Sequence, residues 1–196
     1  VVLDNMSQLV DWFKASSIRK LETVNPLLAD VLPRAKQLFV SMVKGADVQI
    51  TQGLRTAKEQ NALYQKGRTK PGKIVTYADG YKNKSNHQSP VEGQPGQAVD
   101  FAISVNGRYV DDGHDPLYKK FNDCVRRAET ELGVSGIEWG GTWAGKKFDG
   151  DHLECQDATK AAGSKFTQTK KTASSFVRKQ PAAKPVAPHS DLVDSF

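Results

Sequence analysis

Two histidines of the chain lie near acidic residues, which is an arrangement that metal-dependent hydrolases need. His87 is followed by Asp100, and His152 is preceded by Asp149. A catalytic zinc ion takes three protein ligands from imidazole and carboxylate groups and keeps a fourth position open for water. His87, Asp100 and His152 could supply those ligands. A single histidine or aspartate in a loop is more often a surface residue, however, so the spacing by itself leaves both readings open.

A hydrolytic zinc site also requires a base that accepts the proton of the attacking water. Asp149 stands three positions before His152, and a carboxylate at that place can reach the same water. Glu138 is an alternative base, but its greater distance from His152 along the chain favours Asp149. His114 is an alternative ligand, although it stands in a turn of acidic residues without the pattern around the other two histidines.

Periodicity and capping residues predict the helices that must position these groups. Asn25 and Thr56 are good N-terminal caps, and glycines follow the expected helix ends. Pro33 lies inside one predicted helix and is expected to kink or split it. The predicted helices cover residues 6–20, 25–44, 56–66 and 115–132.

Alternation of apolar and polar residues predicts the strands. Residues 48–51 and 97–105 alternate in this way, and Asn106-Gly107 predicts a hairpin turn into residues 108–110. Two further strands are expected at the ends of residues 136–155. Residues 68–96 are rich in Gly, Pro, Lys, Asn and Ser, so a long loop with at most a short strand near 74–77 is predicted. Loops of such length in a compact domain usually carry function.

Composition indicates a single folded domain. The chain has 196 residues, of which 38% are hydrophobic and 26% charged, unlike disordered, collagen-like or membrane proteins. No stretch approaches the roughly 20 apolar residues of a membrane span, so no transmembrane segment is expected. The N-terminus does not resemble a secretory signal, which predicts synthesis into the cytoplasm. Cys124 and Cys155 are too few for a disulfide framework and are expected to be buried thiols in a reducing compartment.

The basic residues gather toward the C-terminus. Seven Lys and Arg residues stand against three Asp in residues 157–196, within a chain of net charge +6. This segment is rich in Ala, Lys, Thr, Ser, Gln and Pro, and it is too poor in apolar residues to fold alone. A folded domain over residues 1–156 and a disordered basic tail over 157–196 are therefore predicted. The tail suits contact with the anionic cell envelope, although a purely solvated tail explains the charge as well.

The combination of motifs resembles a known family, the zinc D-alanyl-D-alanine carboxypeptidases and phage L-alanyl-D-glutamate endopeptidases. Residues 53–56 also resemble the family's G-x-R-T segment, and the resemblance covers about residues 20–155. The phage endolysin branch is the most similar. The motifs that carry the resemblance are Ser85-x-His87, Gly96-x-Ala98-x-Asp100, Trp139-Gly140-Gly141-x-Trp143 and Asp149-x-x-His152-x-Glu154.

The resemblance implies a small α+β domain in which helices pack on an antiparallel sheet and Zn²⁺ lies in a cleft on the sheet. It assigns His87, Asp100 and His152 as the zinc ligands. It further implies Asp149 as the general base and Arg55 as the cation that stabilises the oxyanion of the tetrahedral intermediate, where a fixed positive charge has its largest effect.

Four further residues have two readings each. Ser85 and Glu154 either orient a metal ligand or bind substrate, or they have a plain structural role. Trp139 and Trp143 flank two glycines, and they either pack in the core or form a wall of the substrate site.

The chain departs from the family pattern between the first histidine and the aspartate. Twelve residues separate His87 from Asp100, whereas the family usually has six. The additional residues are rich in Pro, Gly and Ser, and a longer flexible loop costs little additional closure entropy. A lengthened surface loop with both ligands retained is therefore expected.

The resemblance implies a phage-type endolysin that hydrolyses the bond between L-Ala and D-Glu in peptidoglycan stem peptides during host cell lysis. A monomer is expected that stays in the host cytoplasm until a membrane lesion gives access to the cell wall. One alternative is a D-Ala-D-Ala carboxypeptidase or dipeptidase. Another is a zinc-containing module that binds the wall without catalysis, although such a module needs neither Asp149 nor Arg55. Only the basic charge suggests nucleic acid, and no recognised motif supports that partner.

Overall fold

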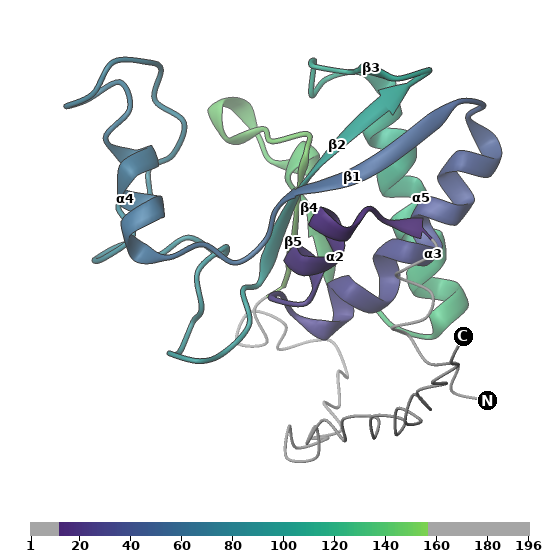
Figure 1. Ribbon diagram of the computed structural model, residues 1–196, viewed down its shortest axis with the longest axis horizontal. Coiled ribbons are helices and arrows are strands. Elements are labelled where there is room, and N and C mark those ends of the chain that lie inside the picture. The colour runs from purple at the N-terminus through teal and green to yellow at the C-terminus, as the bar shows by residue number, and fades with distance from the viewer. Residues whose placement is uncertain (1–11, 157–196) are drawn as a thin grey trace, which may run out of the picture. The chain divides into compact units, whose positions relative to one another are not determined.

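A five-stranded antiparallel sheet and four α-helices make up most of the structure, a computed structural model that describes residues 12–156 (Figure 1). The strand order is β1-β2-β5-β4, and β3 pairs with β2. This is the predicted α+β fold. The strands are β1 (Ala46–Gln52), β2 (Ala98–Val105), β3 (Arg108–Tyr109), β4 (Ile137–Trp139) and β5 (His152–Cys155). The helices are α2 (Ala15–Leu21), α3 (Pro26–Met42), α4 (Ala57–Tyr64) and α5 (Pro116–Leu132).

Local sequence signals begin and end these elements as expected. The Asn25 side chain accepts a hydrogen bond from the backbone of Leu27 at the start of α3, and the Thr56 hydroxyl accepts one from the backbone of Glu59 in α4. Gly133 ends α5 in the left-handed conformation, with φ of 68°. Asn106 and Gly107 form the predicted hairpin turn between β2 and β3.

The core lies between the sheet and the pair of long helices. α3 packs against α5, and Phe39 of α3 meets Phe121 of α5 edge to face, with ring centroids 5.5 Å apart. Phe101 of β2 is completely buried, and its ring centroid lies 4.8 Å from that of Phe121. Burial of such side chains is the main force that holds the helices on the sheet. Cys124 and Cys155 are buried and unpaired, as expected.

Two helix predictions need correction. α3 runs without a break from Pro26 to Met42, so Pro33 does not split this helix, and the kink that was the other expected outcome stays a prediction. A proline removes one helical hydrogen bond, but the neighbouring apolar side chains are fully buried, and packing of this kind supplies most helix stability in proteins. The helix predicted over residues 6–20 is not continuous, because Lys14 is extended and α2 starts at Ala15. Residues 1–11 lie outside the described part.

Residues 53–97, which connect β1 to β2, form a region that we call the polar lobe, with α4 as its helix (Figure 1). No hydrophobic side chain is buried within this range, all of which is described. Its buried side chains are polar instead. Gln60 Nε2 donates to the carbonyl of Ala78 at 2.9 Å, and Gln88 Nε2 donates to that of Gly80 at 2.9 Å. We call residues 12–52 and 98–156 the sheet half.

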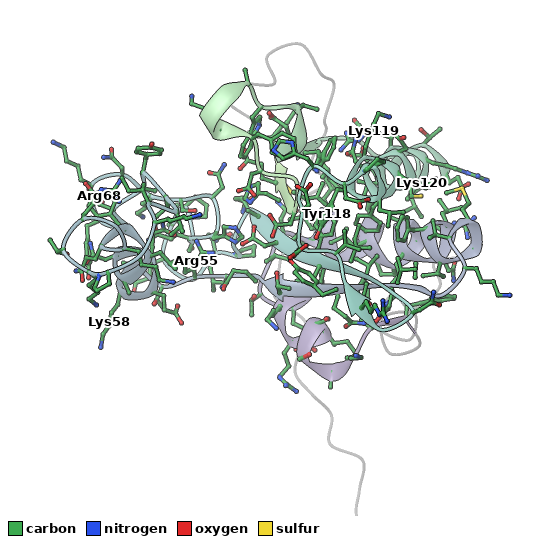
Figure 2. All side chains as sticks on the ribbon, turned by 90° about the horizontal axis from the view of Figure 1, so that it is seen from above. Arg55, Lys58, Arg68, Tyr118, Lys119 and Lys120 are labelled. Carbon is green, nitrogen blue, oxygen red and sulfur yellow. The ribbon has the colours of Figure 1, made fainter. Side chains whose placement is uncertain are left out.

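The rest of the lobe is a loop, as predicted. The possible strand near residues 74–77 is not formed. Arg68 connects α4 with the loop that follows it. Its guanidinium lies over the ring of Tyr64, 3.9 Å from the centroid, and donates to the carbonyl of Thr76 at 3.1 Å. Arg55, Lys58 and Arg68 all belong to this lobe, whereas Lys119 and Lys120 belong to α5 (Figure 2).

Two further predictions concern the basic tail and membrane spans. The basic tail predicted over residues 157–196 lies outside it. Among the helices of residues 12–156, none has the length and apolar character that crossing a bilayer would require.

Candidate active site

The pairing of β2 with β5 brings two of the expected ligands together. Asp100 pairs with His152 in the antiparallel register, and side chains at paired positions project from the same face of a sheet. His152 Nδ1 lies 2.9 Å from Asp100 Oδ1. On the other side of β2 the register with β1 shifts between Ile50 and Gln52, so that Gln52 pairs with Asp100. This irregularity comes just before the segment that carries Arg55, and bulges are common beside active sites.

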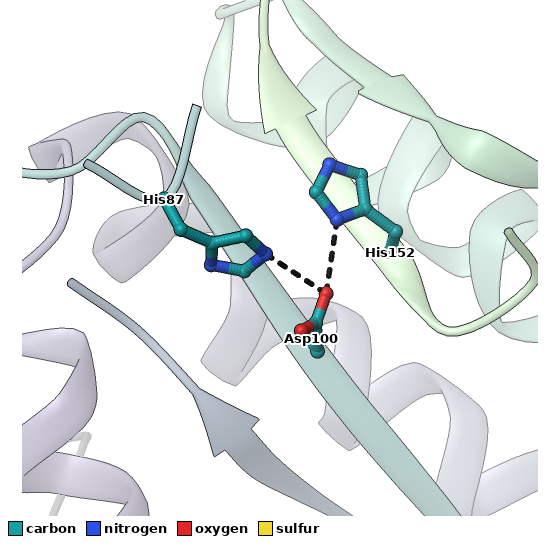
Figure 3. Close-up of side chains that lie close together, drawn as sticks. All are labelled: His87, Asp100 and His152. Carbon is teal, nitrogen blue, oxygen red and sulfur yellow. Dashed lines mark hydrogen bonds and ion pairs between the residues drawn. The ribbon is translucent and has the colours of Figure 1, made fainter. Parts of the chain in front are cut away.

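His87 reaches the same oxygen from the polar lobe (Figure 3). Its Nε2 lies 3.0 Å from Asp100 Oδ1, and its Nδ1 lies 3.0 Å from the carbonyl oxygen of Gly53. The backbone N–H of Arg55 donates to the carbonyl of His87 at 2.9 Å. The Ser85 hydroxyl accepts from the backbone of His87 at 3.3 Å, so Ser85 shapes the turn that presents the imidazole. The lengthened loop after His87 does not remove this residue from the cluster.

The donor set of this cluster fits a zinc ion. Nδ1 of His87 donates to Gly53, and Nε2 of His152 faces the Glu154 carboxylate at 3.0 Å. In neutral imidazoles the other two nitrogens are then acceptors. These nitrogens and an Asp100 oxygen lie within 4.8 Å of one another, and a cation or shared protons must hold three acceptors so close. Two imidazoles and one carboxylate match the ligands of catalytic zinc sites.

The pKa shifts of Asp100 and His152 indicate that the cluster favours positive charge. Burial tends to raise the pKa of Asp100, but hydrogen bonds with His152 and His87 hold that pKa well below its usual range. Burial tends to lower the pKa of His152, yet its hydrogen bonds with Asp100 and Glu154 raise the pKa to about 9. Glu154 thus contacts His152, the position from which carboxylate partners orient histidine ligands in metal sites.

Arg55 lies at the border between the cluster and the lobe. Its guanidinium donates to Gln60 Oε1 at 2.7 Å and lies 3.5 Å from Asp100 Oδ2. The side chain is only 11% exposed. Burial lowers the pKa of Arg55, while the charges of Asp100, Glu59 and Asp149 raise it, and an arginine keeps its charge in proteins. A positive group is thus fixed beside the cluster.

Asp149 lies close to the cluster, and the glycine at position 140 leaves room for its backbone there. Its backbone N–H donates to the carbonyl of Gly140 at 3.1 Å, and a Cβ atom at Gly140 would lie 2.5 Å from the Asp149 carbonyl oxygen. A side chain there would push Asp149 away from His152. Burial and a hydrogen bond with Asp151 raise the pKa of Asp149 to about 7, whereas the charge of His152 lowers it. A carboxyl group with such a pKa can both accept and donate a proton near neutrality.

The structure separates the roles of the two tryptophans. Trp139 is 9% exposed, belongs to the core and donates from Nε1 to the carbonyl of Gly150 at 2.7 Å. Trp143 is partly exposed, and its ring centroid lies 5.1 Å from that of His152. Glu138 holds Trp143 through a hydrogen bond of 2.6 Å. The carboxylate that was the alternative base therefore positions an aromatic ring beside the site.

Other residues stand differently from their sequence readings. His114, the alternative ligand, stacks on Phe148 with ring centroids 3.8 Å apart and is not part of the metal-binding cluster. Asp151 is a residue that sequence reasoning missed as a partner of Asp149. Their spacing of two in a strand-like segment would have been the available signal, but the chain turns before β5, and the two carboxyl groups meet there.

Comparison with known proteins gives a consistent result. The profile of the phage L-alanyl-D-glutamate peptidases matches residues 10–162. The chain is 35% identical over 151 residues to the peptidoglycan L-alanyl-D-glutamate endopeptidase CwlK of Bacillus subtilis, covering 74% of this chain and 82% of that protein. The crystal structure of the L-Ala D-Glu endopeptidase ChiX of Serratia marcescens is similar with a TM-score of 0.50 and 26% identity, covering 74% of this chain and 89% of that one.

Proposed function

The chain belongs to the phage L-alanyl-D-glutamate peptidase family, and on this premise we propose that it hydrolyses the bond between L-Ala and D-Glu in the stem peptides of peptidoglycan. The names of the relatives CwlK and ChiX describe this activity. The observation that carries the proposal is the convergence of His87, Asp100 and His152 beside a fixed arginine and a carboxyl group of raised pKa.

The proposed metal is Zn²⁺, which the imidazoles of His87 and His152 and the carboxylate of Asp100 would hold. When bound, it would supply a Lewis acid that polarises the scissile carbonyl and makes a water nucleophilic at neutral pH. Gly53 and Glu154 set the imidazole tautomers for this task through their contacts with the two histidines.

The remaining steps belong to side chains of the chain itself. Asp149 accepts the proton of the attacking water and then donates it to the amine that leaves, because its pKa lies near neutrality. Arg55 stabilises the developing negative charge on the alanyl carbonyl oxygen from its place beside Asp100. Trp143 forms a wall against which the peptide lies, close to His152.

The biological setting that we propose is lysis of a bacterial host. The profile that matches the chain describes phage enzymes, and peptidoglycan is the substrate named for CwlK. In this proposal a monomer stays in the host cytoplasm until a membrane lesion opens the way to the wall. The basic residues of the segment 157–196 then favour contact with the anionic envelope.

Mass spectrometry of purified peptidoglycan tests the function directly. The zinc-loaded protein is incubated with peptidoglycan, in parallel with chelator-treated protein and with the Asp149→Ala variant. A new free amine on D-Glu that is absent from both controls is the expected product. Its appearance identifies the bond that is cut, the need for the metal and the need for Asp149.

Other products point to the alternatives. Release of terminal D-Ala would identify a D,D-carboxypeptidase, and the L-Ala–D-Glu bond would then remain intact. Peptidoglycan that stays unchanged under every condition would overturn the catalytic proposal. Retention of the inactive protein on the wall in a sedimentation assay would then identify a binding module.

A further inference from the structure

A cleft in the polar lobe has Arg55 in its lining, the residue that also contacts the metal-binding cluster. Its volume is about 400 Å³, and its lining includes Arg55, Tyr81, Lys84, Ser89 and Glu92. This volume lies in the range of pockets that bind small ligands. Arg55 belongs to both places, because its guanidinium also lies 3.5 Å from Asp100. A peptide bound at the cluster therefore has the cleft directly beside it.

The backbone holds Lys84 in a defined place at this cleft. On its N-terminal side, the Asp79 carboxylate accepts three backbone N–H groups in succession, from Tyr81, Lys82 and Asn83, at 2.8, 2.8 and 3.0 Å. On its C-terminal side, the backbone N–H of Ser85 donates to the buried Gln88 side chain at 3.0 Å. The exposed side chain of Lys84 thus extends from a backbone that hydrogen bonds hold on both sides.

The lengthened loop between His87 and Asp100 supplies the facing wall. Ser89 and Glu92 of this loop line the cleft. Lys84 Nζ lies 3.4 Å from the carbonyl oxygen of Pro90 in the same loop, so one long hydrogen bond draws the ammonium group toward that wall. An ammonium group has three donors, and two of them remain for a ligand.

The charges of the cleft favour an anion. Arg55 and Lys84 line it, against the single acidic residue Glu92. The Arg55 guanidinium is already engaged by Gln60 and Asp100. Lys84 has only the long contact with Pro90, so it is the cation that can take a carboxylate from a ligand as a charge-assisted hydrogen bond.

We infer that Lys84 binds the α-carboxylate of D-Glu and thereby makes the enzyme specific for stem peptides in which this group is not amidated. The inference rests on the proposed function. In the stem peptide, D-Glu continues through its γ-carboxyl, so its α-carboxylate is free and sits on the carbon that bears the scissile nitrogen. This anion lies within a few bonds of the scissile peptide bond, and of the two cations that line the cleft, Lys84 is the one with free donors.

Two synthetic peptides and two variants test this specificity. The peptides are L-Ala-γ-D-Glu-L-Lys-D-Ala and the same sequence with D-isoglutamine, which carries an α-carboxamide. Lys84→Met removes the charge and keeps much of the side chain. Lys82→Met is the matched control, because Lys82 lies on the same turn but does not line the cleft. Steady-state kinetics of the zinc-loaded full chain gives kcat and KM for each pair, and melting curves establish that the variants fold.

For the acidic peptide we expect Lys84→Met to raise KM by about tenfold with little change in kcat, since one charge-assisted hydrogen bond is lost equally from substrate and transition state. For the amidated peptide we expect a change below about twofold, and Lys82→Met should affect neither. Equal effects of Lys84→Met on both peptides, or none, would overturn the inference while leaving the function intact. If the wild-type protein cleaves neither peptide, the proposed function itself is wrong, and the inference is overturned with it.

Discussion

The sheet half and the polar lobe hold the same active site by different forces. Asp100 and His152 stand on paired strands whose other faces and neighbours are buried in an apolar core. Arg55 and His87 stand in a region without a buried hydrophobic side chain, where Gln60 and Gln88 take the place of a core. Of the nine large hydrophobic side chains exposed among the described residues, six belong to the lobe.

From this difference we infer that the residues on the sheet have fixed positions, whereas those in the polar lobe can shift. Apolar packing is non-directional and involves many side chains at once. The sheet therefore keeps Asp100 and His152 in position as long as the core stays packed. The lobe relies on individual hydrogen bonds, each worth only about 0.5–1.5 kcal/mol net. Regions with few buried apolar contacts open locally at low free-energy cost. The lobe is therefore the part that can adapt to a substrate, and a metal at the shared cluster would join the two regions.

The largest effect is expected at Asp149, on the sheet side. Asp149→Asn should lower kcat by about 10²–10⁴-fold, the usual contribution of a general base, while zinc content measured by atomic emission stays that of the wild type. Asp111→Asn, at an exposed acidic position, is the matched control and should retain full activity. An active Asp149→Asn enzyme would transfer the role of base to another group.

The next effect concerns stability and contrasts two aromatic residues. Phe101→Ala removes a fully buried ring from β2 and should lower the free energy of unfolding by about 3–5 kcal/mol. Tyr77→Ala in the lobe, where the side chain is 69% exposed, should change it by less than about 0.5 kcal/mol. Urea unfolding measures both. Similar losses for the two variants would show that the lobe has an apolar core after all.

Metal binding should protect the lobe more than the sheet. At a zinc concentration one hundredfold above Kd, the free energy of unfolding should rise by about 2.7 kcal/mol. Hydrogen exchange should slow most around His87, because the metal connects this loop residue to Asp100 and His152 on the sheet. Uniform protection across both regions would mean that they already form one cooperative unit without the metal.

A smaller and more local effect is expected at Gln60. This fully buried side chain contacts Arg55, Thr76 and Ala78. Gln60→Ala leaves these partners unsatisfied, at a cost of about 1–3 kcal/mol, and should reduce kcat because Arg55 loses its orientation. Hydrogen exchange should quicken in residues 74–84 but not in β2. Gln65→Ala, at the C-terminal cap of the same helix, removes a half-buried side chain that contacts Asn61 and not Arg55. It is the control, and equal effects of the two variants would contradict the role of Gln60.

The smallest expected effect is a difference in the response to acid. Backbone N–H groups of Asn83, Tyr81 and Lys82 hold the pKa of Asp79 below its usual 3.8. Its stabilising contribution is therefore present above pH 3.8 and is lost as the pH falls through the lower folded-state pKa. Burial raises the pKa of Glu129 in the sheet half above its usual 4.5, so its contribution is present below that pH and is lost as the pH rises through the higher folded-state pKa.

Acidification should accordingly loosen the turn at residues 79–83 before the sheet. Amide protection factors of Tyr81, Lys82 and Asn83, measured by NMR between pH 7 and pH 3, report this change. Asp79→Asn keeps an acceptor oxygen but does not titrate, so its turn should respond less to acid. A turn that keeps its protection at pH 3 in the wild-type protein would contradict the assignment.

Much of the fold and the identity of the clustered residues could be predicted from local sequence. Caps such as Asn25 and Thr56 and the Asn106-Gly107 turn act on the few residues next to them, so the sequence records them directly. The motif resemblance identified His87, Asp100 and His152 as a set, and these three residues form the cluster. Pro33 does not split α3, because burial, which local sequence does not report, outweighs the local rule about proline in helices.

The sequence by itself determined which side chains could bind a metal and which elements would carry them. Only the tertiary structure decided that Asp100 and His152, 52 positions apart, share a strand register, that Trp139 packs inward while Trp143 faces His152, and that Asp151 meets Asp149. The physical reason is that helix and turn signals are local, whereas register, burial and the pKa of a carboxyl group depend on residues that approach each other only when the chain has folded.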